Sequence, residues 1–240
     1  MKSLISVIIP VYNQATALEK CLESIRGQSY SNIETIVIDD GSTDTLRSQI
    51  TSLQSKFSFQ YYSQSNKGAP AARNKGFELS GGEYVIFWDA DIVGKSDMLA
   101  KMLQSLKDNP EASYSYSNFY FSNGKKMKCG KFSEDKLKRQ NYITTTSLIK
   151  RCDFPGFDES LKRFQDWDLW FTMMEQNKFG IWIDEYLFRI ISKGSISTWL
   201  PKFAYKGFFK KLPFIKPRVE NYEKARKKIY KKHGLIDTNA

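Results

Sequence analysis

The sequence has few of the residues that build zinc sites and disulfide frameworks, with 3 cysteines and a single histidine among 240 residues. Cys21, Cys129 and Cys152 are widely spaced, odd in number and without any C-x-x-C pattern. This usage excludes a disulfide framework and a zinc site of ordinary spacing, and it indicates free thiols in a reducing cytosol. We expect all three to behave as small buried residues. The sole histidine, His233, lies in a basic C-terminal segment, and we expect it at the surface.

Long apolar runs are also missing. No stretch of the chain approaches the roughly 20 apolar residues that span a bilayer, and the N-terminus enters a strand-like run at Leu4 without a signal-peptide pattern. A content of 41% hydrophobic and 15% aromatic residues is typical of a globular protein. A chain of this length can form one α/β domain with a short appendage.

The positive charge is unevenly placed. Residues 201–240 contain twelve Lys or Arg and three acidic residues, so this segment accounts for nine of the eleven net positive charges. Tyr205, Phe208, Phe209 and Leu212 recur at helical spacing among lysines. The pattern predicts a basic amphipathic helix on an anionic membrane surface. The alternatives are a helix docked on the body of the protein or one that pairs protomers; nothing indicates nucleic-acid binding.

Strand and helix signals alternate through the first 110 residues. Apolar, β-branched runs at residues 4–11, 34–39 and 84–88 predict strands buried on both faces of a sheet. Amphipathic helices are predicted between them, the first opening on a capping box at Thr16 and Glu19. Such strand-helix-strand units predict an α/β fold with a doubly wound, mostly parallel sheet and right-handed crossovers.

The second half of the sequence is less regular. Residues 114–121 predict a strand, and residues 142–149 are rich in threonine and prone to form β-structure. Trp167 and Trp170 begin an apolar stripe at helical spacing, and short strands are expected near Ile181 and Leu187.

Polar clusters follow three of the predicted strands: residues 10–13, residues 39–42 and the Asp89-Ala90-Asp91 segment. Parallel sheets bind ligands beyond the carboxyl ends of their strands, so the clusters are expected to share one site. Each could instead be a solvated loop with a helix cap. Asp89 and Asp91 are hard oxygen ligands suited to Mg²⁺ or Mn²⁺, which keeps its other positions for water and substrate phosphates. Such a cation neutralises charge on a diphosphate leaving group.

Several motifs resemble those of the family 2 glycosyltransferases. They are VIIPVYN at 7–13, VIDDGSTD at 37–44, GAPAARNKG at 68–76, the Asp89-Ala90-Asp91 segment and QDWDLW at 165–170. The resemblance covers roughly residues 3–200, in order and at normal spacing. It implies a GT-A fold over residues 1–200, with a nucleotide-binding half at 1–110, an acceptor-binding half at 111–200 and a basic helical tail at 201–240.

When the functional positions of the family are carried over to this sequence, the resemblance implies roles in donor binding for Pro10, Tyr12, Asp40, Gly68, Arg73, Asp89 and Ala90. Pro10 and Tyr12 would line the nucleobase pocket, and Asp40 would accept a hydrogen bond from uracil or thymine. Arg73 would lie near the base or diphosphate, or would pair with a carboxylate of the body. Asp89 would face the ribose or the metal, and Asp91 would bind the metal, Mn²⁺ or Mg²⁺.

Asp166 is the expected catalytic base. An inverting transfer needs a carboxylate that deprotonates the acceptor hydroxyl, opposite the leaving diphosphate. Asp166 could alternatively serve only the helix dipole, and Asp168 is the competing base. The implied reaction moves a sugar from a UDP- or dTDP-sugar to a hydroxyl of a lipid-linked or growing saccharide, in cell-surface polysaccharide assembly at the cytosolic face of a membrane.

The sequence departs from the family pattern at two places. Ile92 replaces a third acidic residue, and residues 189–197 contain no histidine to complete a metal site. The third metal contact is therefore open among water, phosphate oxygens and a substituting cation such as Lys193. Two other functions compete. A haloacid-dehalogenase-like phosphatase also ends a strand in D-x-D, but no Gly-Asp pair follows; the other is a catalytically weak module that binds sugar nucleotides or glycans.

Overall fold

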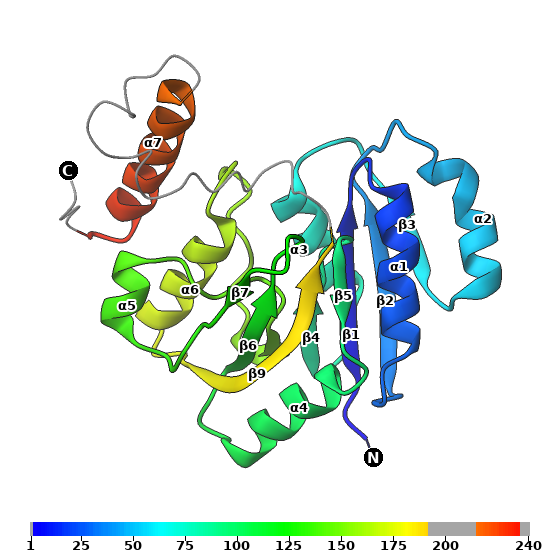
Figure 1. Ribbon diagram of the computed structural model, residues 1–240, viewed down its shortest axis with the longest axis horizontal. Helices are drawn as coiled ribbons and strands as arrows, with labels where there is room; N and C mark the ends of the chain where they lie inside the picture. Colours follow the sequence, from blue (N-terminus) through cyan, green and yellow to red (C-terminus); the bar gives the residue numbers. More distant parts are fainter. Residues whose placement is uncertain (1, 192–214, 236–240) are drawn as a thin grey trace.

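The computed structural model describes residues 2–191 and 215–235. Its centre is one sheet of nine strands in the order β3-β2-β1-β4-β8-β6-β9-β5, with β7 paired to β6 (Figure 1). In chain order the described elements are β1 (Ile5–Val11), α1 (Ala15–Arg26), β2 (Ile33–Asp39), α2 (Leu46–Lys56), β3 (Gln60–Ser63), α3 (Ala69–Leu79), β4 (Tyr84–Phe87), β5 (Ile92–Gly94), α4 (Met98–Asp108), β6 (Tyr114–Tyr120), β7 (Lys126–Met127), α5 (Glu134–Arg139), β8 (Leu148–Lys150), a 3₁₀ turn (Arg151–Asp153), α6 (Gln165–Glu175), β9 (Gly180–Ile190) and α7 (Lys216–Lys232).

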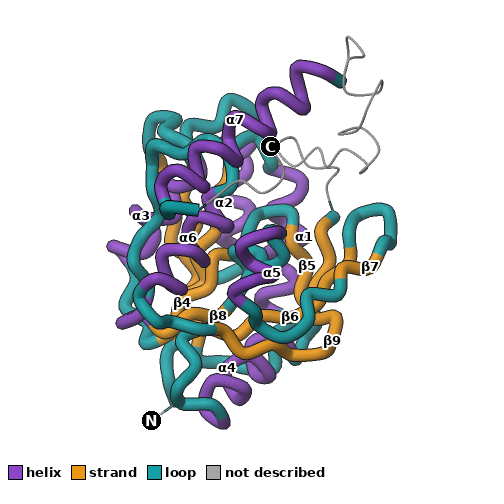
Figure 2. The backbone as a smooth tube through the Cα atoms, turned by 90° about the vertical axis from the view of Figure 1, so that its left-hand side faces the viewer, coloured by secondary structure: helices purple, strands orange, loops and turns teal. Residues whose placement is uncertain are grey.

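The sheet has a parallel half and a mixed half. Strands β3, β2, β1 and β4 are all parallel neighbours. Beyond them β8 runs antiparallel to both β4 and β6, whereas β9 is parallel to β6 and antiparallel to β5. Figure 2 shows β4, β8, β6 and β9 side by side along the sheet. The predicted α/β fold is confirmed; the sheet, predicted to be mostly parallel, is parallel in its first half and mixed in its second.

Close helix packing depends on the apolar strands. All seven residues of β1 are buried, as expected for a strand covered on both faces. On one face α3 approaches so closely that a Cβ added at Gly76 would lie 2.3 Å from Cγ2 of Ile8. Glycine at this position therefore sets the distance between α3 and the sheet, and with it the position of the polar residues at the start of that helix.

Three local predictions need correction in whole or in part. Helix α1 begins after Gln14, so Thr16 lies inside it, and the carboxylate of Asp44 in a neighbouring loop accepts from the Ala15 N–H instead. Only the end of residues 142–149 is a strand, β8; the preceding residues form a loop, where the Ile143 carbonyl oxygen accepts from Trp170 Nε1 of α6 at 2.8 Å. The two short strands expected near Ile181 and Leu187 are one curved strand, β9.

Helix α7 packs on the body of the protein against α5 and α6. Val219 and Ile229 are fully buried, and the Tyr230 hydroxyl donates to the Lys138 carbonyl oxygen at 2.6 Å. His233, expected at the surface, has a side chain only 2% exposed. That expectation is wrong because two carboxylates of α6 bind the imidazole. The charges of the C-terminal segment alone do not reveal such partners elsewhere in the chain. The predicted aromatic stripe from Tyr205 to Leu212 lies outside the described residues.

Within the described part of the chain, no helix is both long enough and apolar enough to cross a membrane. The cysteines are free thiols. Cys21 and Cys129 are buried as expected, whereas Cys152 is exposed because it lies in the 3₁₀ turn at the end of β8.

Candidate active site

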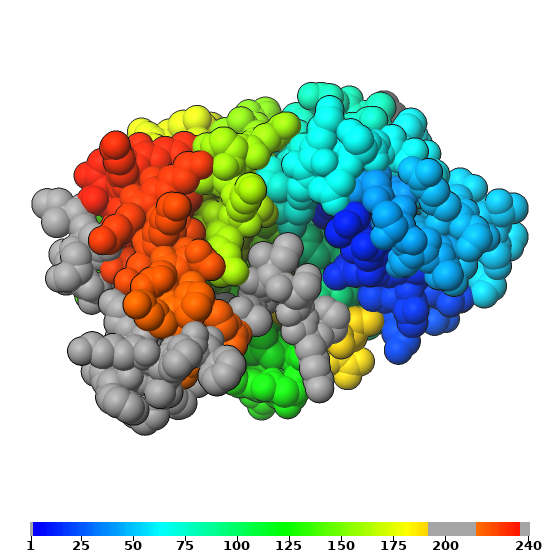
Figure 3. Space-filling model, turned by 90° about the horizontal axis from the view of Figure 1, so that it is seen from above, coloured from blue at the N-terminus to red at the C-terminus, as the bar shows by residue number. Residues whose placement is uncertain are grey.

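The carboxyl ends of β1, β2 and β4 lie together at one edge of the sheet. Val11 at the end of β1 pairs with Asp39 at the end of β2, and the Trp88 N–H after β4 donates to the Ile8 carbonyl oxygen of β1 at 2.8 Å. Figure 3 looks down on this edge, with the blue, cyan and yellow-green segments of the chain around it and the orange α7 beside the yellow-green one. The three polar clusters that follow these strands are therefore neighbours.

Asp39 organises the first loops of this edge. Its buried carboxylate accepts hydrogen bonds from the Ser42 N–H at 2.8 Å and the Tyr61 hydroxyl at 2.7 Å, and Arg47 lies 3.7 Å away. Burial opposes ionisation, but these donors and the Arg47 charge outweigh it and lower the pKa of Asp39 below its usual value. Asp39 thus acts as an ionised anchor within the fold.

Asp40 fixes the loop that leads into α3. Its Oδ1 accepts from Gln64 Nε2 at 2.8 Å and the Lys67 N–H at 2.9 Å, and its Oδ2 accepts from the Gly68 N–H at 2.7 Å. Gly68 has φ +94°, a conformation that glycine adopts without strain. Asp40, predicted from the sequence to bind the base, therefore shapes the loop that leads into α3.

Pro10 and Tyr12 occupy the end of β1. Pro10 is buried and lies opposite Ile38 of β2, whereas the Tyr12 residue is 47% exposed. An exposed aromatic ring at this edge can stack on a planar base.

Arg73 links the two halves of the site. Its Nη2 lies 2.7 Å from Asp89 Oδ1, and its Nη1 donates to Gln165 Oε1 at 3.3 Å. The guanidinium lies over the Phe157 ring, 5.3 Å from the centroid, and Arg73 is only 6% exposed. The sequence allowed Arg73 to pair with a carboxylate of the body, and the structure shows this pairing. The partner is Asp89 of the Asp89-Ala90-Asp91 segment, called the D-x-D segment below.

The D-x-D segment is held by backbone contacts on both sides. The Ile92 N–H donates to the Asp89 carbonyl oxygen at 2.9 Å, and the Ile191 N–H donates to the Asp91 carbonyl oxygen at 2.8 Å. Ala90 between them is fully buried, so the backbone that carries Asp89 and Asp91 is fixed.

The fit of a divalent cation can be judged from these side chains. Among the described residues no group of three His, Cys, Asp or Glu side chains could hold a metal ion. Mg²⁺ and similar cations, however, are often bound by one or two carboxylates together with water and substrate phosphates. Asp89, whose Oδ1 accepts from Arg73, and Asp91 supply carboxylate oxygens of this kind within one short segment. The donor set therefore fits a cation that a diphosphate shares.

Asp166 lies in the first turn of α6 and is half-buried. Its Oδ2 accepts from Asn141 Nδ2 at 2.8 Å, and its Oδ1 accepts from the Trp167 N–H at 2.9 Å. The surrounding protein desolvates the carboxyl and raises the pKa of Asp166, although these two donors and the charge of Arg73 act in the opposite direction. A carboxylate with a raised pKa is a stronger base than an ordinary aspartate.

Asp168, the competing base, has both carboxylate oxygens engaged. Lys232 Nζ lies 2.8 Å from Oδ1 and 2.9 Å from Oδ2, and His233 Nε2 lies 2.9 Å from Oδ1. The residue is 3% exposed and connects α6 to α7. Its contacts are those of a structural anchor between the helices.

Three residues at the site were not predicted from the sequence: Asn141, Phe157 and Gln165. Gln165 opens the QDWDLW segment and could have been found next to Asp166. Asn141 and Phe157 lie in loops with no distinguishing pattern, and only the tertiary structure brings them to Asp166 and Arg73.

The arrangement of this sheet is that of the GT-A glycosyltransferase fold, which solved structures share. S. aureus TarS in complex with UDP-GlcNAc matches with a TM-score of 0.66 and 20% identity over 83% of this chain and 62% of that chain. The mannosyltransferase PcManGT from Pyrobaculum calidifontis, in complex with GDP-Man and Mn²⁺, matches with a TM-score of 0.66 and 19% identity over 94% of this chain and 70% of that chain.

The sequence profile described as Glycosyl transferase family 2 matches residues 6–161. The chain therefore belongs to glycosyl transferase family 2, and the resemblance found in its motifs is confirmed. This membership excludes the phosphatase alternative.

Two relatives illustrate how the chain compares in length. An uncharacterized glycosyltransferase of Rickettsia felis is 29% identical over 84% of this chain, which spans only 35% of that protein. The GalNAc(5)-diNAcBac-PP-undecaprenol beta-1,3-glucosyltransferase of Campylobacter jejuni is 27% identical over 95% of this chain and 78% of its own length.

Proposed function

We propose that the protein is an inverting glycosyltransferase that moves a sugar from a UDP- or dTDP-sugar to a hydroxyl of a lipid-linked or growing saccharide in cell-surface polysaccharide assembly. The name of the Campylobacter jejuni relative specifies an acceptor on undecaprenyl diphosphate, and TarS binds UDP-GlcNAc. These likenesses support the substrate classes. Residues 1–110 would bind the nucleotide and residues 111–200 the acceptor.

The position of Asp166 relative to the D-x-D segment supports this reaction most directly. Arg73 contacts Asp89 on one side and Gln165, the neighbour of Asp166, on the other. A base on one side of the reacting carbon and a diphosphate site on the other is the arrangement that an in-line, inverting displacement needs.

Each residue then has a definite task. Tyr12 stacks on the base, Asp40 accepts a hydrogen bond from it and maintains the loop at Gly68, and Pro10 lines the pocket. Asp166 takes the proton of the acceptor hydroxyl as that oxygen attacks the anomeric carbon, and the bond to the diphosphate breaks. Asp89 and Asp91 would hold Mn²⁺ or Mg²⁺, which when bound offsets charge on the departing diphosphate.

The proposal extends to the membrane. Lipid-linked acceptors are confined to a membrane surface, and the lysines around the predicted stripe at residues 205–212 would attract anionic headgroups on its cytosolic face. Replacing Lys202, Lys206, Lys210 and Lys211 by Gln should weaken sedimentation with anionic vesicles and leave nucleotide binding intact. Equal sedimentation of both proteins would refute this contact.

A donor screen tests the reaction. Purified protein is incubated with UDP-, dTDP- and GDP-sugars with and without Mn²⁺, and released nucleoside diphosphate is measured together with transfer to saccharide acceptors. One donor should be turned over, EDTA should stop turnover, and Mn²⁺ should restore it. Asp166→Asn should bind nucleotide but not transfer, and Asp91→Asn should lose the response to Mn²⁺. Nucleotide binding without turnover of any donor would favour the weak binding module instead.

A further inference from the structure

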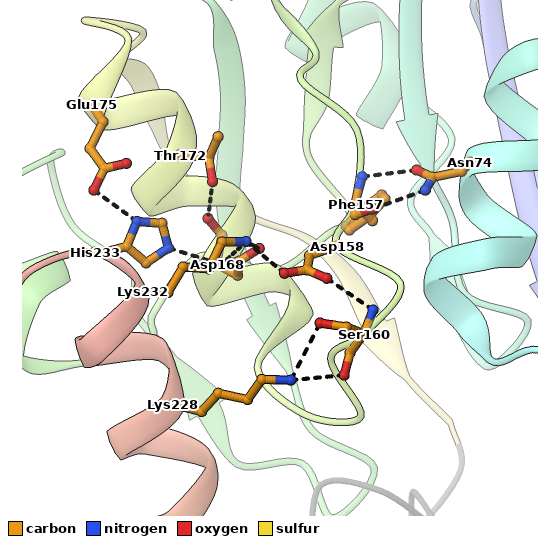
Figure 4. A network of polar contacts seen from close by, with 10 residues as sticks. All are labelled: Asn74, Phe157, Asp158, Ser160, Asp168, Thr172, Glu175, Lys228, Lys232 and His233. Carbon is orange, nitrogen blue, oxygen red and sulfur yellow. Dashed lines mark hydrogen bonds and ion pairs between the residues drawn. The ribbon is translucent and has the colours of Figure 1, made fainter.

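The C-terminal end of α7 is tied to the helix that carries Asp166. The imidazole of His233 lies between two carboxylates of α6, with Nε2 at 2.9 Å from Asp168 Oδ1 and Nδ1 at 2.8 Å from Glu175 Oε1 (Figure 4). The ring also packs on Phe171, with centroids 5.1 Å apart. Since each ring nitrogen faces a carboxylate oxygen, the geometry favours the doubly protonated, cationic imidazole.

Two lysines of α7 extend the contact to the loop before α6. Lys232 Nζ lies 2.8 Å from Asp158 Oδ2 as well as bridging to Asp168, and Lys228 Nζ donates to the Ser160 carbonyl oxygen at 3.0 Å. Figure 4 shows these side chains converging from α7 on the loop and on α6. The end of α7 therefore contacts two segments at once.

The same loop continues to the donor side of the site. Asn74, the residue after Arg73 in α3, donates to the Phe157 carbonyl oxygen at 2.9 Å and accepts from the Phe157 N–H at 2.8 Å. The Phe157 ring supports the guanidinium of Arg73. Contacts thus run from α7 through residues 157–160 to Arg73, and separately from α7 through Asp168 to the first turn of α6.

We propose that α7 positions the active site, and that His233 and Lys232 hold Asp166 and Arg73 in register by fixing Asp168 and Asp158. This inference rests on the proposed function, because it assigns to α7 a role in the same transfer. Asp166 and Asp168 are two residues apart and so point about 200° apart around a helix. Anchoring Asp168 on one side of α6 therefore orients Asp166 toward the other.

The positioning of α6 by α7 depends on the charge of His233. Burial alone would lower the pKa of His233, but its bonds to Asp168 and Glu175 and their charges outweigh burial and raise it. The other charged groups of this cluster are Lys232 and its partner Asp158. Because the pKa of His233 is raised, its ionic contact with Asp168 and Glu175 has its full strength at pH below the ordinary histidine pKa. The contact is lost as pH rises through the raised pKa. Turnover should then fall on the alkaline side as α7 loosens.

The test compares the unchanged 240-residue chain with two variants. His233→Gln keeps one donor but no charge, and Lys231→Gln, which removes an exposed charge on the same turn, is the matched control. With the donor identified by the screen, His233→Gln should lower kcat about tenfold while the nucleotide Kd changes less than about threefold, because small misplacements of catalytic groups reduce rate more than binding. The variant should also lose the alkaline fall in kcat. Lys231→Gln should match the natural protein in both measurements.

Hydrogen exchange gives a readout that needs no turnover. The Asp168 N–H bonds to the Phe164 carbonyl oxygen at 2.9 Å, so its exchange rate reports the order of the first turn of α6. His233→Gln should exchange faster there at pH 6.5 and no faster than the natural protein at high pH. Asp158→Asn, which cuts only the Lys232 contact, serves as the second variant if His233→Gln does not fold.

Three results would overturn the inference. The first is a natural kcat in both His233→Gln and Asp158→Asn, and the second is unchanged exchange of the Asp168 N–H. The third is a parallel loss of kcat, nucleotide affinity and Tm, which marks general unfolding. A natural protein that turns over no donor would defeat the proposed function instead, while the exchange comparison would still decide whether α7 orders the first turn of α6.

Discussion

Arg73 and Asp89 form a salt bridge of 2.7 Å between α3 and the segment after β4, and Arg73 also reaches Gln165 at the start of α6. The arginine side chain is 7% exposed and the aspartate side chain 36% exposed. A buried cation beside a partly open carboxylate keeps a positive charge next to the site where the diphosphate is proposed to bind. The planar guanidinium reaches its two partners with two separate nitrogens, a geometry that the single ammonium of a lysine does not reproduce at this site.

Arg73→Lys should therefore lower kcat/KM at least tenfold by about 1.4 kcal/mol of lost transition-state stabilisation. The ammonium can keep one contact, to Asp89 or to Gln165, but not both. Steady-state kinetics with the donor from the screen measures the effect. Glu78→Gln on the exposed side of the same helix is the control, and equal kinetics for Arg73→Lys and Glu78→Gln would contradict the role of Arg73.

Asn141→Ala should move the acid limb of the kcat profile to higher pH. Asn141 donates to the Asp166 carboxylate, which favours the ionised form and offsets part of the rise in the pKa of Asp166 caused by burial. Without this donor the pKa rises further, and since the base must be ionised, activity appears only at higher pH. A pH–rate series from pH 4.5 to 9 measures the shift; an acid limb that moves to lower pH would refute the assignment of Asp166.

Asp166→Asn should stabilise the fold at neutral pH while it abolishes transfer. Because the pKa of Asp166 is raised in the fold, its protonated form is favoured there, and stability is lost as pH rises through that pKa. An amide removes this cost once the Asn141 side chain turns its Oδ1 toward the new NH₂ group, and single stabilising substitutions commonly give about 0.5–2 kcal/mol. Thermal unfolding at pH 4 and pH 7.5 checks the sign, since the gain should shrink at the lower pH.

Asp40→Asn should weaken nucleotide binding at least tenfold. The carboxylate accepts three hydrogen bonds from the loop before α3, and an amide nitrogen in place of one oxygen faces an N–H it cannot accept from. A lost hydrogen bond to a charged group costs about 1.5–3 kcal/mol. Calorimetric titration with UDP and dTDP measures the Kd; Asp108→Asn at the exposed end of α4 is a charge-matched control.

Gly76→Ala should destabilise the protein by about 1–3 kcal/mol, the usual cost of overpacking. The new Cβ would lie 2.3 Å from Cγ2 of Ile8 and would push α3 away from the sheet, together with Arg73. Gly27→Ala is the matched control, because its Cβ would meet no atom closer than 3.5 Å. Urea denaturation of both variants gives the comparison, and equal midpoints would show that α3 can shift without cost.

Much of the parallel half was predictable from the sequence. Strands β1, β2 and β4 are rich in β-branched and other apolar residues, and such runs leave little choice of structure between turn signals. The mixed half was predicted less well, since residues 142–149 and the two segments of β9 owe their conformation to partners distant in the sequence. β-structure depends on such neighbours more than on the segment itself.

The sequence by itself determined the family, the α/β class and the positions of Asp40, Asp89, Asp91 and Asp166, because motifs and strand ends are local features of the chain. Only the tertiary structure decided what those residues contact. It joined Arg73 to Asp89, placed Asn141 on Asp166 and buried His233 between Asp168 and Glu175. These contacts depend on the distance and direction between elements far apart in the chain, and packing of the whole core sets both.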